Sequence, residues 1–133
     1  MNDLHLSPAP ITSLYAAVLG LMFVAITLRI AVTRNSRGIS LGDGGDHDFN
    51  KIIRGHGNFI ETTPIALILI LLLELQGAAS MTLHTLGIAL VAGRVSHYLQ
   101  LTGVVKPLLY RVVGMVLTLS TIIISAFRLL IGV

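Results

Sequence analysis

The sequence predicts an all-α membrane protein, built as one four-transmembrane-helix bundle. Hydrophobic residues make up 54% of the 133 residues and charged residues only 11%, a composition typical of chains that lie in lipid. A bilayer core about 30 Å thick requires roughly 20 apolar residues per helix. Four spans with short connections therefore use nearly the whole length, and we expect a single domain over residues 1–133.

Polar or glycine-containing connections separate four apolar runs. The first connection covers residues 35–50 and is rich in glycine and aspartate, whereas residues 76–80 and 103–107 form short turns. We place the four spans at about 11–32, 51–75, 81–101 and 108–131.

Cap and breaker residues mark the ends of the first two spans. Thr12 or Ser13 is the expected N-cap of the first span, and Asp48 or Asn50 that of the second. Pro64 lies inside the second span, where proline removes a backbone donor and should kink the helix.

The basic residues indicate the orientation. Arg34, Arg37 and Lys51 lie in or beside the first connection and Lys106 lies in the third, whereas the second connection carries no charge. The positive-inside rule places both basic connections in the cytoplasm and both termini on the outer side.

Four polar residues follow one another at helical spacing at the start of the second span. Lys51, Arg54, Asn58 and Glu61 fall at i, i+3, i+7 and i+10, so they lie along one face. A charge at mid-membrane costs at least about 2.5 kcal/mol on insertion scales. This face should therefore contact protein and not lipid.

Other basic residues share the predicted depth of that face: Arg29 and Arg34 at the end of the first span, Arg94 and His97 in the third, and Arg111 at the start of the fourth. One interpretation is a structural salt bridge from Glu61 to Arg54 or Arg94, with the remaining arginines reaching lipid headgroups. The alternative is a water-accessible pocket for an anionic ligand, because Glu61 alone cannot neutralise so many cations.

Several kinds of site are not expected. The absence of cysteine excludes disulfides, thiolate metal sites and a protein thiol nucleophile, so any thiol chemistry must use a substrate's sulfur. The spacing of Asp43, Asp46, His47 and Asp48 matches no calcium or zinc pattern, and we expect no metal. The net charge of +3 is small and dispersed, so nucleic-acid binding is not expected.

Three segments resemble the MAPEG family, the membrane-associated proteins of eicosanoid and glutathione metabolism, and are most similar to its small bacterial inner-membrane members. The similarity covers about residues 26–118. The segments are Arg54-x-x-x-Asn58-x-x-Glu61-x-x-Pro64, Gly93-Arg94-x-x-His97 and Lys106-Pro107-x-x-x-Arg111.

The resemblance implies a homotrimer in the bacterial inner membrane, with glutathione as co-substrate bound between subunits near the cytoplasmic face and both termini periplasmic. It implies a glutathione transferase or peroxidase that attacks apolar or lipid-like electrophiles, with Arg111 as the catalytic residue facing the sulfur. Lys106 is the alternative to Arg111. The implied glutathione-binding residues are Arg29, Arg34, Lys51, Arg54, Asn58, Glu61, Arg94, His97 and Lys106.

The chemistry of glutathione suits these residue types. Its two carboxylates match arginine, whose planar fork binds carboxylate bidentately, and its ammonium group matches a glutamate. A guanidinium beside its thiol would lower the thiol pKa and favour the thiolate. Leu101 stands where eicosanoid-making members have a tyrosine, and Val112 and Met115 stand where they have hydroxyl residues. These departures separate the chain from that branch.

Two other functions fit parts of the pattern. The chain could be a non-catalytic lipid-binding or scaffold member of the same family. It could also be a small multidrug transporter, because four spans and one membrane glutamate describe that class too. Transporters of that class keep the glutamate in the first span, where this chain has no acid.

Overall fold

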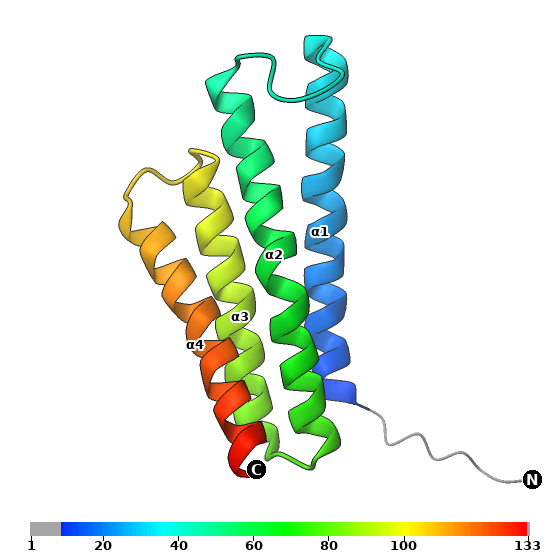
Figure 1. Ribbon diagram of the computed structural model, residues 1–133, viewed down its shortest axis with the longest axis vertical. Helices are drawn as coiled ribbons and strands as arrows, with labels where there is room; N and C mark the ends of the chain where they lie inside the picture. The colour runs from blue at the N-terminus through cyan, green and yellow to red at the C-terminus, as the bar shows by residue number, and fades with distance from the viewer. Residues whose placement is uncertain (1–8, 133) are drawn as a thin grey trace, which may run out of the picture.

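The computed structural model describes residues 9–132, which form an up-and-down bundle of four helices (Figure 1). Helix α1 spans Pro10–Arg37, α2 spans His47–Leu75, α3 spans Ser80–Leu101 and α4 spans Leu109–Ile131, and the described residues contain no strand. The predicted all-α class is confirmed. Helices α1 and α2 both extend further into the first connection than the sequence predicts.

Three of the helices are long and apolar enough to cross a membrane, namely α1, α2 and α4. Helix α3, the predicted third span, runs beside them and contacts each of the other three helices. Its length is that of a span, and two of its polar side chains, Arg94 and His97, are buried in the bundle. Helix α3 is therefore the shared packing partner of the apolar helices.

The first connection ends in a cap that the sequence did not predict. The carboxylate of Asp46 accepts a hydrogen bond from the backbone N–H of Phe49 at 2.9 Å, which makes Asp46 the N-cap of α2. Asp48 and Asn50 lie inside the first turns instead, where Asp48 pairs with Lys51. The predicted cap at Asp48 or Asn50 is wrong, because the helix begins earlier.

The start of α1 is capped by another helix. The carboxylate of Glu74, near the end of α2, accepts from the backbone N–H groups of Ile11 and Thr12 at 2.9 and 2.7 Å. Residue 9 occupies the N-cap position and gives no side-chain bond. The predicted cap at Thr12 or Ser13 is wrong, because a carboxylate distant in sequence takes over the role.

Small residues let α3 and α4 approach closely. A Cβ atom on Gly114 would lie 2.6 Å from the carbonyl oxygen of Gly93, so a side chain at either position would force the helices apart. Close backbone approach at small residues is the usual packing mode of membrane helices. The crossing fixes the end of α3 that bears His97 against the beginning of α4.

The two basic connections lie at one end of the bundle, and the α2–α3 turn lies at the other (Figure 1). Pro64 lies inside α2, which continues to Leu75. The basic residues around both connections thus meet at one end, as the alternating topology predicted.

Candidate functional site

Arg94 ties α3 to α2 in the bundle interior. Its side chain is 1% exposed, and Nη1 donates to the backbone oxygen and Oδ1 of Asn58 at 3.2 and 2.8 Å and to Oγ1 of Thr62 at 2.6 Å. Nε and Nη2 of Arg94 have no partner within residues 9–132. A buried guanidinium without a counter-ion is costly, and this cost is not offset within residues 9–132.

Glu61 does not provide that anion within the subunit. The ion pairs of the described residues are Arg37–Asp46 and Lys51–Asp48, and the side chain of Glu61 is exposed on α2. The alternative of a structural salt bridge from Glu61 to Arg54 or Arg94 is therefore not realised in residues 9–132.

Three cations surround a cleft between the start of α2 and the α3–α4 connection. Lys51, Lys106 and Arg111 line this cleft, which has a volume of about 450 Å³ and which we call the basic cleft. A smaller hollow of about 200 Å³ shares Lys51 with it and adds Arg54. Four of the predicted site residues thus gather around adjoining hollows, and these hollows have no acidic lining residue.

Arg111 also faces a second, more apolar environment. Together with His97, it lines a hollow of about 440 Å³ whose other lining residues are Leu108, Val112, Met115 and Val116. We call this the apolar hollow. His97 is 3% exposed, whereas Arg111 is exposed. The guanidinium of Arg111 therefore stands where a cationic cleft meets an apolar surface.

The two predicted site arginines of α1, Arg29 and Arg34, do not line the basic cleft of this subunit. Nη1 of Arg29 donates to the hydroxyl of Tyr98 at 3.4 Å, and its guanidinium lies 5.8 Å from the Tyr98 ring centroid. Nη1 of Arg34 donates to the carbonyl of Gly42 at 2.7 Å, and its guanidinium lies 5.1 Å from the ring centroid of Phe49. Arg29 thus links α1 to α3, and Arg34 holds the first connection.

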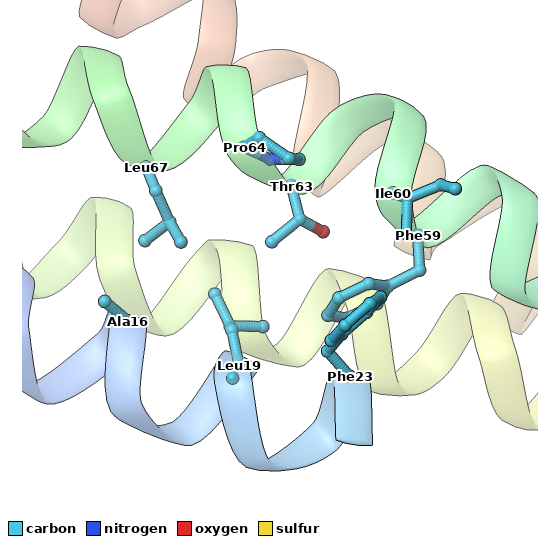
Figure 2. A pocket seen from close by; sticks show the side chains of 9 residues that line it. Ala16, Leu19, Phe23, Phe59, Ile60, Thr63, Pro64 and Leu67 are labelled. Carbon is cyan, nitrogen blue, oxygen red and sulfur yellow. The ribbon is translucent and has the colours of Figure 1, made fainter. Parts of the chain in front are cut away.

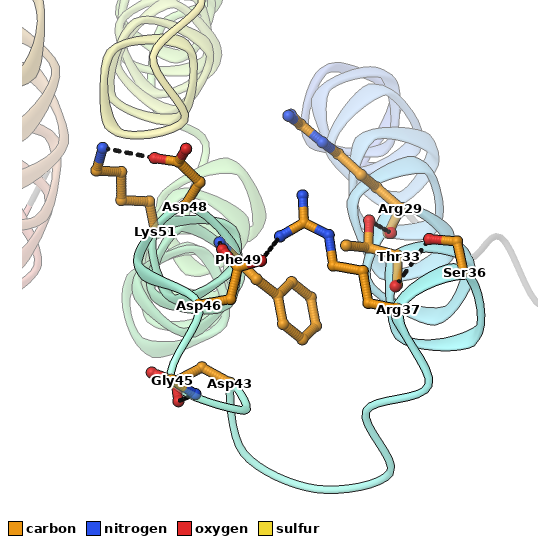
Figure 3. Close-up of polar contacts among 10 residues, drawn as sticks. All are labelled: Arg29, Thr33, Ser36, Arg37, Asp43, Gly45, Asp46, Asp48, Phe49 and Lys51. Atoms are coloured by element: carbon orange, nitrogen blue, oxygen red, sulfur yellow. Dashed lines mark hydrogen bonds and ion pairs between the residues drawn. The ribbon is translucent and has the colours of Figure 1, made fainter.

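The acidic residues of the first connection are engaged in local bonds (Figure 3). Asp43 accepts from the backbone N–H of Gly45 at 2.9 Å, and Asp46 pairs with Arg37 as well as capping α2. The hydrogen bond from the Phe49 N–H, together with Arg37, holds the pKa of Asp46 below its usual value. These carboxylates order the connection that leads into α2.

Sequence reasoning missed two residues of this site. Thr62 receives a bond from Arg94, and Tyr98 lies under Arg29 and against Gly55. Thr62 falls four residues after Asn58, so helical spacing could have placed both on one face. Tyr98 directly follows His97 and carries no comparable periodic signal.

Comparison with known proteins shows the family of the chain. Residues 12–131 match the MAPEG family. The chain is similar to the inner membrane protein YecN from two strains of Escherichia coli, in each case 36% identical over 88 residues that cover 66% of this chain and 67% of the relative. No solved structure matches the chain. Because the family match covers nearly all of the described helices, the chain belongs to the MAPEG family.

Proposed function

We propose that this protein binds glutathione at the basic cleft and activates its thiol for attack on apolar electrophiles dissolved in the membrane, as a glutathione transferase or peroxidase. The observation that carries the proposal is the position of Arg111. Its guanidinium borders both the basic cleft, which suits a polar anion, and the apolar hollow, which suits an apolar co-substrate.

The charges of the site complement those of glutathione. Lys51, Arg54 and Lys106 offer cations to its two carboxylates, and charge-assisted hydrogen bonds to carboxylate are among the strongest available. Two buried guanidinium nitrogens of Arg94, Nε and Nη2, have no partner within residues 9–132, and Nη1 bonds to Asn58. Glu61, which is exposed on α2, would pair with the ammonium group of glutathione.

The reaction needs a thiolate. In this proposal, Arg111 stays protonated and stabilises the thiolate electrostatically, because arginine does not give up its proton in proteins. The thiol proton passes to solvent through the exposed basic cleft. The sulfur lone pair then forms a bond to the electrophilic carbon, and the leaving group departs with the bonding electrons. With a hydroperoxide, the sulfur instead attacks the terminal oxygen, the O–O bond breaks, and the alkoxide leaves and takes a proton from solvent. A second glutathione then converts the sulfenic acid to the disulfide and water.

The functional unit in this proposal is a homotrimer. The outward face of α2 carries charges in its basic half and apolar residues in its other half, and a charged face inside a membrane has to be covered by protein. A second copy of the chain would cover it and would place glutathione between subunits. The residues of this face are Arg54, Asn58, Glu61, Ile65, Ile68, Leu72 and Leu75.

The proposed location is the bacterial inner membrane, because the E. coli relatives are named inner membrane proteins. The basic end of the bundle would face the cytoplasm, and both termini would be periplasmic, since lysine and arginine concentrate at that end. Residues 1–8 and 133 lie outside the described residues.

Conjugation of an aryl halide tests the activity and identifies the activating residue. Wild-type protein in lipid nanodiscs should form the dinitrophenyl conjugate from 1-chloro-2,4-dinitrobenzene and glutathione. Arg111→Ala should lower kcat at least about a hundredfold, in the range found when one preorganised donor is lost. Lys106→Ala should mainly raise KM. A wild-type rate equal to the uncatalysed rate, with glutathione bound, would favour the non-catalytic lipid-binding or scaffold function.

A further inference from the structure

A separate pocket lies between α1 and α2, away from the basic cleft. It has a volume of about 350 Å³, and Figure 2 shows its lining, which includes Leu19 and Phe23 of α1 and Phe59 and Thr63 of α2. It shares no lining residue with the basic cleft or the apolar hollow. Both helices are apolar enough to span the membrane, so this pocket opens toward lipid.

Thr63 presents an unpaired hydroxyl to this pocket. The residue is 3% exposed, and its Oγ1 has no hydrogen-bond partner within residues 9–132. Several other helical threonines donate to the carbonyl four residues earlier, as Thr62 does to Asn58 and Thr118 does to Gly114. Figure 2 shows the Thr63 side chain directed from α2 into the space between the helices, with Phe23 and Phe59 at one end.

Pro64 follows Thr63 directly and removes one backbone donor from this part of α2. Because proline has no backbone N–H, the carbonyl of Ile60 loses its usual helical donor. Ile60 and Pro64 both line the pocket. The pocket therefore combines one buried, unpaired hydroxyl with apolar walls.

These features select the chemistry of a ligand. No charged side chain lines the pocket, so the ligand should be neutral. A ligand hydroxyl would pair with the unpaired Oγ1 of Thr63. The rings of Phe23 and Phe59 stack with centroids 6.4 Å apart and an angle of 23°, and Phe23 is 40% exposed, so a ligand ring could pack against this pair.

We propose that this pocket binds a small neutral phenol dissolved in the bilayer. Its volume is at the lower end of the range of about 300 to 1,000 Å³ usual for ligand sites. A lipid acyl chain, or an apolar side chain from a second copy, would fill the space but leave the Thr63 hydroxyl unpaired. The site requires neither Arg111 nor glutathione, so it is independent of the proposed transferase activity.

Displacement of a photolabel tests the proposal. The full-length protein in nanodiscs is irradiated with benzophenone, and the labelled peptides are mapped by mass spectrometry. Label should appear on α1 near Phe23 and on α2 near Phe59. With concentrations expressed as mole fraction in lipid, 4-butylphenol should displace this label at about tenfold lower concentration than butylbenzene, the effect of hydrogen bonding at one site.

Matched variants isolate the hydrogen bond. Thr63→Val removes only an unpaired hydroxyl and should leave folding intact. In this variant, 4-butylphenol and butylbenzene should displace the label at similar concentrations. Thr85→Val changes an exposed threonine of α3 that bonds to Met81 and should preserve the tenfold difference. Equal displacement by both compounds in wild-type protein would overturn the proposal in favour of an acyl chain. Absence of label on α1 and α2 would overturn it in favour of a second copy.

Discussion

At the scale of single residues, Arg94 is the most tightly constrained part of the candidate site. One nitrogen of its guanidinium makes three hydrogen bonds to α2, while two others have no partner in residues 9–132. A group that only joined two helices would gain nothing from leaving two buried donors unpaired, since each costs about 1 to 3 kcal/mol. If Nη1 holds the guanidinium in place and an anionic ligand bonds to Nε and Nη2, all three nitrogens have a role.

Substitution of Arg94 should separate ligand binding from folding. Arg94→Met keeps the bulk of the side chain and removes a buried charge that has no counter-ion, which offsets the loss of its three hydrogen bonds to α2. We expect glutathione affinity to fall at least tenfold in isothermal titration while the thermal midpoint in detergent changes little. Arg128→Met, which removes a half-buried arginine bonded to Thr82 at the opposite end, is the matched control and should bind normally.

Helical spacing and topology predicted which polar residues share a depth better than they predicted the contacts of those residues. Arg94 and Asn58 were expected to share one pocket, and they do share hydrogen bonds, because helical spacing and alternating topology determine depth and face. Arg34 was expected near the ligand, yet it bonds to the carbonyl of Gly42 and covers Phe49. A backbone carbonyl in a loop carries no sequence signal, so this contact could not be predicted.

At the scale of helices, the ends are held by other elements. Glu74 caps α1 although it belongs to α2, and Tyr15 of α1 reaches His84 of α3 with 2.9 Å between its hydroxyl and Nδ1. The apolar runs were long enough to reveal every helix from the sequence. The ends of the helices could not be predicted in the same way, because a cap that comes from a neighbouring helix depends on packing and not on local residues.

The inter-helix cap predicts a clear effect on stability. Glu74→Ala removes the acceptor for two N–H groups of α1 and should lower the free energy of unfolding by about 1 to 2 kcal/mol. Glu74→Gln keeps one acceptor oxygen without the charge and should lose less. Equilibrium unfolding in mixed micelles measures both variants, and equal stability of wild type and Glu74→Ala would contradict the assigned role.

At the scale of the whole molecule, the bundle divides its polar groups between two ends. The basic connections meet at one end, where Lys51, Arg54, Lys106 and Arg111 line adjoining hollows. The sequence predicted this common depth from topology alone. It could not predict which residues of one subunit face each other and which face a neighbour, because that depends on the rotation of each helix about its axis.

Mixed assemblies should reveal whether the site is shared. If Arg54 of one subunit and Arg111 of its neighbour act on the same glutathione, co-expression of Arg54→Ala and Arg111→Ala subunits should restore about a quarter of the sites in a cyclic trimer. The conjugation rate of the mixture measures this recovery, and each variant alone is the control. No recovery in mixed trimers would assign both residues to a site within one subunit.

The central claim is that Arg111 turns bound glutathione into a thiolate at the edge of the membrane. The most direct measurement is a glutathione titration of wild type, Arg111→Lys and Arg111→Ala, followed by the ultraviolet absorbance of the thiolate and, in parallel, by calorimetric binding. We predict a saturable thiolate signal in wild type, a reduced one in Arg111→Lys, and binding without the signal in Arg111→Ala. A wild-type protein that binds no glutathione at millimolar concentration, or an Arg111→Ala variant that keeps the full thiolate signal, would contradict the account.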